Sequence, residues 1–150
     1  MSRGPALLCY DGSDDARHAI QAAKDLLTPG PTIVLAVWEP YSPSLLAPVR
    51  STLSVASGLA KEFDEASVDL ARRTADEGVR IAVEAGFEDP KPLIVHGKPR
   101  DAIVEAAEEH GAHVIVMGNR GHGATESTIF GSVSTAVVHR SQVPVLVVRP

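Results

Sequence analysis

Five short apolar segments, each bounded by turn residues, constrain the fold of this chain more than any other feature of its sequence. Each segment is too short for a helix and nearly continuous in apolar side chains, which is typical of strands buried on both faces. The predicted strands are Ala6–Tyr10, Thr32–Trp38, Lys91–His96, His113–Met117 and Val143–Arg149.

Apolar residues spaced three and four apart fill the stretches between these strands and are typical of amphipathic helices. The predicted helices are Ala16–Leu27, Leu59–Ala85, Asp101–His110 and Ser132–Arg140. Gly78 lies inside the longest pattern and weakens the prediction of one unbroken helix there. Strands that alternate with helices indicate right-handed βαβ units. We therefore predict an α/β fold with a doubly wound, mainly parallel sheet and helices on both faces.

The length of 150 residues is that of one domain, so we expect residues 1–150 to form a single unit. A formal net charge of −5 argues against a general affinity for nucleic acid or for an anionic membrane. No apolar run approaches the ~20 residues that span a bilayer, and no secretory signal pattern opens the chain, so we expect a cytoplasmic protein. Cys9 is the one cysteine and lies in an apolar run, which predicts a buried, unreactive thiol.

The segment Glu39–Ser57 does not fit the alternation of strands and helices. It carries three prolines and five serines, so we expect an irregular loop after the second strand. Long loops in compact domains are often lids or interaction surfaces. A surface insertion without a specific role explains the same composition equally well.

Glycines cluster where the fourth strand leads into the last helix. The run reads Gly118, Asn119, Arg120, Gly121, His122 and Gly123, and Gly131, Ser132 and Val133 follow at the start of the helix. Glycine permits positive φ and lets main-chain amides approach a ligand without a Cβ in the way. The start of a helix presents free N–H groups to an anion. The spacing predicts a loop that wraps phosphates, and a glycine-rich turn before a capped helix remains the alternative.

A second candidate segment, Asp11, Gly12 and Ser13, follows the first strand directly. If the first and fourth strands are neighbours in a doubly wound sheet, both loops open into the crevice where the strand order reverses. Asp11 could then accept hydrogen bonds from a ribose or a base, or help to hold a divalent ion. Asp11 or Ser13 could also simply cap the first helix, and the two roles are compatible.

These residues resemble the universal stress protein family over essentially the whole chain. The similarity includes Tyr10–Ser13, Leu35–Val37, Gly97–Pro99, Val114–Gly118 and Val143–Val148. The sharpest match is the family's ATP signature of glycine, two residues, glycine, nine residues, glycine, then serine or threonine. Gly118, Gly121, Gly131 and Ser132 fit this pattern without a gap.

The resemblance implies a five-stranded sheet in the order 3-2-1-4-5 with ATP in its cleft. Mg²⁺ or Mn²⁺ could accompany the nucleotide, and the sequence does not decide between them. It places adenine against the main chain of Val37 and near Asp11, and the phosphates along the loop. The residues carried over to the phosphates and ribose are Gly118, Arg120, Gly121, His122, Gly131, Ser132 and Val133. Arg120 and His122 could equally be solvated side chains. The family also commonly dimerises through its last strand, here Val143–Val148.

Other nucleotide and metal sites fit the sequence poorly. The P-loop pattern is absent, and a phospho-accepting receiver domain needs an aspartate where the chain reads Val95-His96-Gly97. The histidines are scattered singly, and paired carboxylates such as Asp14-Asp15 and Glu108-Glu109 are expected to be exposed charge. We see no nucleophile with a general base, and hence no catalytic residue.

Three functions remain open at this stage. The first is an ATP-binding regulatory protein whose nucleotide state biases dimerisation or partner binding. The second is a slow ATPase or a protein that phosphorylates itself, and the third is a dimer with an empty cleft. Efficient phosphoryl transfer needs a positioned metal, a cation and an oriented nucleophile, which favours the first. For the first two, Gly121→Val or Gly131→Val is expected to block phosphate while leaving the fold intact.

Overall fold

The computed structural model describes residues 3–40, 53–121 and 130–150. Strands and helices alternate through these residues, as the apolar pattern predicts. The elements are β1 (Ala6–Cys9), α1 (Asp14–Leu26), β2 (Thr32–Trp38), α2 (Leu53–Ala85), β3 (Lys91–His96), α3 (Pro99–Glu109), β4 (Val114–Gly118), α4 (Ser132–Arg140) and β5 (Val145–Val148).

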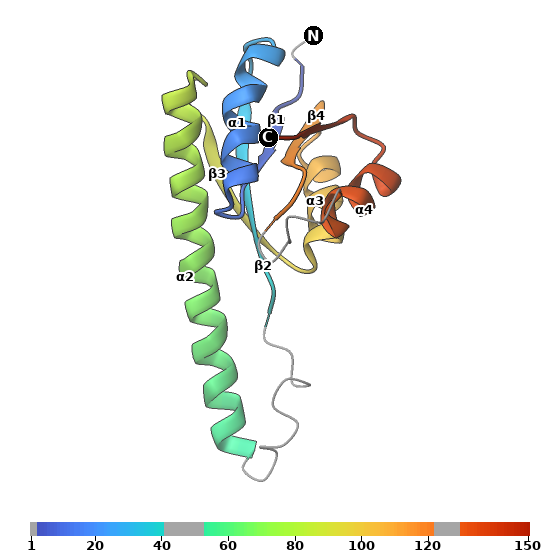
Figure 1. Ribbon diagram of the computed structural model, residues 1–150. Coiled ribbons are helices and arrows are strands. Elements are labelled where there is room, and N and C mark those ends of the chain that lie inside the picture. Colours follow the sequence, from blue (N-terminus) through green and yellow to red (C-terminus); the bar gives the residue numbers. More distant parts are fainter. Residues whose placement is uncertain (1–2, 41–52, 122–129) are drawn as a thin grey trace.

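The five strands form one parallel sheet in the order β3-β2-β1-β4-β5 (Figure 1). In the register of its centre, Leu8 of β1 pairs with Val34 of β2 and with Val116 of β4. This confirms the α/β fold class and the strand order that the family resemblance implies.

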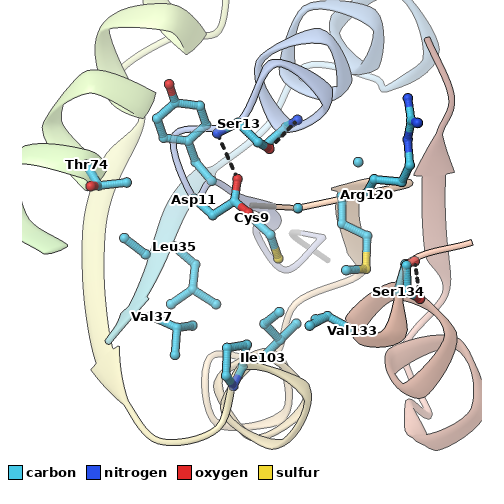
Figure 2. Close-up of a pocket in the computed structure, with 18 of the residues that line it drawn as sticks. Cys9, Asp11, Ser13, Leu35, Val37, Thr74, Ile103, Arg120, Val133 and Ser134 are labelled. Carbon is cyan, nitrogen blue, oxygen red and sulfur yellow. Dashed lines mark hydrogen bonds between the residues drawn. The ribbon is translucent and has the colours of Figure 1, made fainter. Parts of the chain in front are cut away.

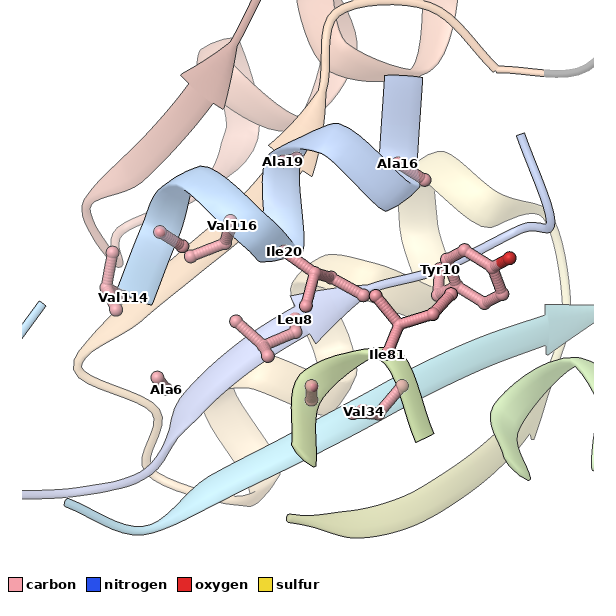
Figure 3. Packing of buried hydrophobic residues seen from close by; sticks show 12 residues of the cluster. Ala6, Leu8, Tyr10, Ala16, Ala19, Ile20, Val34, Ile81, Val114 and Val116 are labelled. Carbon is pink, nitrogen blue, oxygen red and sulfur yellow. The ribbon is translucent and has the colours of Figure 1, made fainter. Parts of the chain in front are cut away.

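Consecutive residues of β1 serve opposite faces of the sheet because side chains alternate along a strand. Leu8 packs in a core with α1 and α2, which contribute Ile20 and Ile81 among others (Figure 3). Leu7 packs in a second core with α3 and α4 on the other face. Both leucines are fully buried. Two cores explain why the strands are apolar at nearly every position.

Helix α2 differs from its prediction at its start. It begins at Leu53, so residues 53–57 of the expected Glu39–Ser57 loop are helical, and that part of the loop prediction is wrong. The run from Leu53 to Ser57 contains neither proline nor glycine, and nothing in it stops the helix. Residues 41–52 of the expected loop lie outside the described residues. The first turns of α2 extend beyond the carboxyl edge of the sheet (Figure 1).

Gly78 does not interrupt α2. It lies where the helix packs closely on the sheet, since a Cβ at this position would be 2.6 Å from Cγ1 of Val34 and 2.9 Å from Cδ1 of Tyr10. Both distances are well below van der Waals contact. Glycine therefore allows the close approach of helix and sheet, and the cost of its flexibility is offset by packing.

None of the helices in the described ranges combines the length and the apolar character that a membrane-spanning segment requires.

Candidate functional site

A cleft of about 880 Å³ opens at the carboxyl ends of β1, β2 and β4. The chain leaves β1 for a helix on one face of the sheet and leaves β4 for a helix on the other, so the cleft lies at the point where the winding reverses. Ten of the predicted site residues line it: Asp11, Ser13, Val37, Gly118, Asn119, Arg120, Gly121, Gly131, Ser132 and Val133. Gly12 does not, and His122 and Gly123 lie outside the described residues.

The turn after β1 caps α1 and brings Asp11 to the edge of the cleft. The Ser13 hydroxyl accepts a hydrogen bond from the N–H of Ala16 at 3.2 Å and so caps α1. The Asp11 carboxylate accepts one from the N–H of Ser13 at 2.9 Å, and Asp11 borders the cleft (Figure 2). Gly12 has a φ of 85°, which allows the chain to turn sharply here.

None of the three signature glycines uses the positive φ that glycine permits. Each instead allows two segments to meet. A Cβ on Gly118 would lie 2.7 Å from the carbonyl carbon of Asp15, and one on Gly121 would lie 2.6 Å from Oδ2 of Asp11. A Cβ on Gly131 would lie 2.7 Å from the main-chain oxygen of Asn119. Because that neighbour is backbone, we now expect Gly131→Val to disturb the fold as well as the ligand site.

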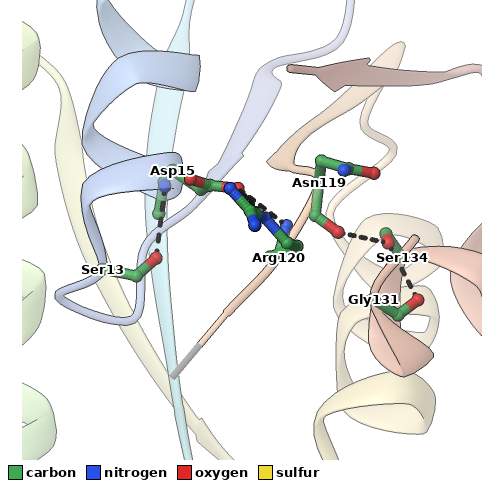
Figure 4. Close-up of polar contacts among 7 residues, drawn as sticks. Ser13, Asp15, Asn119, Arg120, Gly131 and Ser134 are labelled. Carbon is green, nitrogen blue, oxygen red and sulfur yellow. Dashed lines mark hydrogen bonds and ion pairs between the residues drawn. The ribbon is translucent and has the colours of Figure 1, made fainter. Parts of the chain in front are cut away.

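An ion pair that the sequence does not reveal joins the first turn of α1 to the segment that leaves β4. Oδ2 of Asp15 accepts hydrogen bonds from the main-chain N–H of Arg120 at 3.1 Å and from its Nε at 3.3 Å (Figure 4). The Asp15 side chain is only 14% exposed, so the prediction that Asp15 is an exposed charge is wrong. The partners are 105 residues apart, and no local pattern could have linked them.

One half of the cleft is apolar and includes residues that no sequence motif marks. Its lining includes Cys9, Leu35, Ile103 and Met117, and Thr74 and Leu70 of α2 border the cleft as well. Burial raises the pKa of the Cys9 thiol to about 12, and the nearby Asp11 carboxylate adds to the shift. Cys9 is therefore a neutral wall of the cleft at physiological pH, as its apolar surroundings predict.

Tyr10 borders the cleft beside Cys9 and is almost fully buried. Burial raises the pKa of its hydroxyl, and Glu77 raises it further through its charge and a hydrogen bond, while Arg17 opposes the shift. Arg17 and Glu77 pair at 3.0 Å and join α1 to α2. Tyr10 therefore remains a neutral hydrogen-bonding group at this end of the cleft.

In the described ranges 3–40, 53–121 and 130–150, no three His, Cys, Asp or Glu side chains gather in a group that could hold a metal ion. The Asp11 carboxylate lies beside the glycine loop, since its Oδ2 would be 2.6 Å from a Cβ on Gly121. A divalent ion at this point would need most of its oxygen ligands from a bound molecule.

Comparison with known proteins agrees with this architecture. A universal stress protein of Thermus aquaticus is 34% identical over 147 residues, which cover 95% of this chain and 96% of that protein. The solved structure of MJ0577 from Methanocaldococcus jannaschii superposes with a TM-score of 0.70 at 26% identity, over 100% of this chain and 98% of that one. A universal stress protein in complex with cAMP gives 0.69 at 25% identity, over 99% and 98%. The sequence profile of the universal stress protein family matches residues 3–149, and with the fold and cleft described above it shows that the chain belongs to this family.

Proposed function

We propose that this protein binds ATP in the cleft and acts as a regulatory module with little or no turnover. The observation that carries the proposal is the cleft itself. It combines an apolar half, a helix start at Gly131–Ser132 and the carboxylate of Asp11 at the switch point of the sheet. A base, a polyphosphate and a ribose need surroundings of these three kinds.

The start of α4 supports the phosphate position. Gly131 is the N-cap of this helix and has no side chain that could occupy its first N–H groups, while Ser132 is exposed at the first helical position. The first N–H groups of a helix carry partial positive charge and bind anions well. We place the phosphates against the main chain of Ser132 and Val133, with the Ser132 hydroxyl as a further donor.

The apolar half of the cleft supports the base position. Leu35, Val37 and Ile103 line it from β2 and α3, and the strand edge at Val37 offers main-chain groups that can pair with a purine. The related universal stress protein that was solved with cAMP holds an adenine nucleotide. Both the apolar lining and the ligand of this related protein therefore favour an adenine ring in this half of the cleft. Asp11, from the neighbouring strand, would then accept from the ribose hydroxyls.

The surroundings of the phosphates support binding over turnover. Phosphoryl transfer needs a cation at the transferred group and an oriented nucleophile. The Arg120 guanidinium is paired with Asp15, which neutralises it. If Mg²⁺ or Mn²⁺ enters with ATP, Asp11 would hold it together with the phosphate oxygens, and the ion would neutralise phosphate charge.

Calorimetric titration with Mg-ATP tests this proposal, with GTP, AMP and cAMP as competitors. We expect ATP to bind and Asp11→Ala to weaken it by about tenfold, as expected when a charge-assisted hydrogen bond is lost. Asp101→Ala, which removes an exposed carboxylate outside the cleft, is the matched control and should bind like the wild type. Absence of ATP binding by the wild type would refute the proposal. ADP release at excess Mg-ATP that is fast and lost in Asp11→Ala would favour an ATPase instead.

We also propose that two copies pair through β5. This strand is at the end of the strand order, and its pairing in the described residues is with β4. The carbonyl oxygen of Val148 accepts from the N–H of Asn119, which directly follows β4, so by alternation the N–H of Val147 points away from the sheet. Val147→Pro removes this outward-pointing N–H and leaves the hydrogen bonds between β5 and β4 in place. Sedimentation equilibrium should give a dimer for the wild type and a monomer for this variant, and a monomeric wild type would contradict the proposal.

A further inference from the structure

Asp15 and Arg120 connect the first turn of α1 with the segment that leaves β4. A single carboxylate oxygen, Oδ2 of Asp15, accepts from both the main-chain N–H and the Nε of Arg120. The two side chains are 14% and 26% exposed, so the pair is partly shielded from solvent. Shielding strengthens such a contact relative to an ion pair on the open surface.

The direction of the Arg120 side chain separates it from the rest of the cleft lining. Figure 2 shows it running away from Val37, Ile103 and Val133, and Figure 4 shows its guanidinium meeting Asp15. Both the main-chain N–H and Nε of Arg120 are occupied by Asp15 in this arrangement. Neither donor is then available to a phosphate oxygen.

The residues on either side of Arg120 lie directly against the start of α1. A Cβ on Gly118 would lie 2.7 Å from the carbonyl carbon of Asp15, and one on Gly121 would lie 2.6 Å from Oδ2 of Asp11. Arg120 lies between Gly118 and Gly121 in the sequence. Its contact with Asp15 therefore holds the short segment between these two close approaches against the start of α1.

Charge also favours this arrangement. Asp15 is in the first turn of α1, where a carboxylate interacts favourably with the helix dipole. The Arg120 guanidinium approaches the same helix end and would be repelled by the dipole without Asp15. Loss of Asp15 thus removes the attraction that holds Arg120 and leaves a repulsion in its place.

We propose that Asp15 is a positioning residue for the nucleotide. It holds Arg120, and with it the start of the glycine loop, so that Gly121 and Asp11 face the ligand at a fixed separation. Arg120 acts through Asp15 and is not a direct phosphate ligand. This inference rests on the proposed nucleotide-binding function.

A double-mutant cycle tests it, with affinities for AMP, ADP and ATP measured for Asp15→Ala, Arg120→Ala and the double variant. We expect Asp15→Ala to weaken all three nucleotides by the same factor, about tenfold for one coupled contact. Arg120→Ala should have an equal or smaller effect, because its main-chain N–H can still donate to Asp15. The double variant should be no weaker than Asp15→Ala, and Arg120→Lys should recover part of the loss.

A direct phosphate contact from Arg120 gives a different pattern. The loss in Arg120→Ala would then grow from AMP to ATP, and Asp15→Ala would bind as well as the wild type or more tightly, because it releases the guanidinium. That result would overturn the proposal. Arg140→Ala is the matched control, since it removes the ion pair with Asp101 between α3 and α4 outside the cleft and should not change affinity.

Amide exchange without nucleotide gives a readout that does not depend on binding. The Arg120 main-chain N–H should exchange more slowly in the wild type than in Asp15→Ala, and equal rates would overturn the positioning role. If the wild type binds none of the three nucleotides, the proposed function fails and this inference falls with it. If the wild type binds them and the cycle is additive, only the inference fails.

Discussion

The main-chain N–H of Gly131 donates to the carbonyl oxygen of Asn119 over 2.9 Å, and this hydrogen bond joins the two ends of the segment between them. Ser134 reinforces this closure, because its hydroxyl lies 2.9 Å from the same oxygen of Asn119 and 3.0 Å from the carbonyl oxygen of Gly131. Figure 4 shows the three residues together. Loop ends that are joined before a ligand arrives need less ordering on binding.

Ser134→Ala should destabilise the fold and weaken ATP binding together. Ser134 is 2% exposed, so its loss leaves buried carbonyl oxygens with one donor fewer. We expect the free energy of unfolding to fall by about 1–2 kcal/mol in urea denaturation. Thr135→Ala is the matched control, because its hydroxyl donates to the same Gly131 oxygen at 2.9 Å from an exposed position. An equal loss in both variants would contradict a special role for Ser134.

Gly121→Ala and Gly131→Ala should separate ligand binding from stability. The Cβ at 121 meets the tip of the Asp11 carboxylate, which can move aside, whereas the Cβ at 131 meets the main chain of Asn119. We expect Gly131→Ala to lose about 1–3 kcal/mol of stability, as overpacked positions do. Gly121→Ala should keep most of its stability and lose ATP affinity through the displaced Asp11. Thermal unfolding with and without ATP measures stability and ATP binding. A Gly131→Ala variant as stable as the wild type would contradict the close contact between residue 131 and the main chain of Asn119.

Gly78→Ala should destabilise the protein although alanine is the better helix former. The gain in helix propensity is about 1 kcal/mol, and the cost of forcing a methyl group against Val34 and Tyr10 is about 1–3 kcal/mol. Gly58 provides the control in the same helix, since a Cβ there meets nothing within 4 Å. Gly58→Ala should therefore raise the unfolding free energy while Gly78→Ala lowers it. Urea denaturation should show changes in unfolding free energy of opposite sign for the two variants. Equal stabilisation by both substitutions would refute the close packing at Gly78.

The alternation of apolar runs was sufficient to predict the fold because both faces of a doubly wound sheet are buried. Leu7 and Leu8 illustrate this, since each fills a separate core and the strand is consequently apolar throughout. The cleft could be predicted in outline for a similar reason. The carboxyl ends of parallel strands lie at one edge, so Asp11 and Gly118 come together once β1 and β4 are neighbours.

The contacts across the cleft could not be predicted from the same pattern. Asp15 looks like any first-turn carboxylate, and its pairing with Arg120 depends on the relative placement of α1 and β4. The sequence predicts that a Cβ would obstruct the signature glycines, but the obstructing neighbours, such as the Asn119 carbonyl, are provided only by the folded chain. Thr74 and Leu70 line the cleft because α2 lies along one side of it, and no local motif indicates that placement.

The buried thiol of Cys9 should make stability depend on pH above the physiological range. Its pKa is about 12 in the folded protein, against a usual value of 9.0. Between these values the folded state binds more protons than the unfolded state, so the free energy of unfolding falls as pH rises. The contribution of the thiol to the free energy of unfolding is constant below pH 9. Above pH 9 it decreases by up to about 1.4 kcal/mol per pH unit.

Cys9→Ala isolates this effect, because it lacks the thiol and retains Tyr10, whose pKa is also raised. We expect the difference in unfolding free energy between the wild type and Cys9→Ala to be flat from pH 7 to 8.5 and to shift against the wild type from pH 9 to 11. Urea denaturation at fixed ionic strength measures it. A constant difference across the whole range would mean that the folded thiol ionises as easily as the unfolded one, and that the wall of the cleft at Cys9 is open to water.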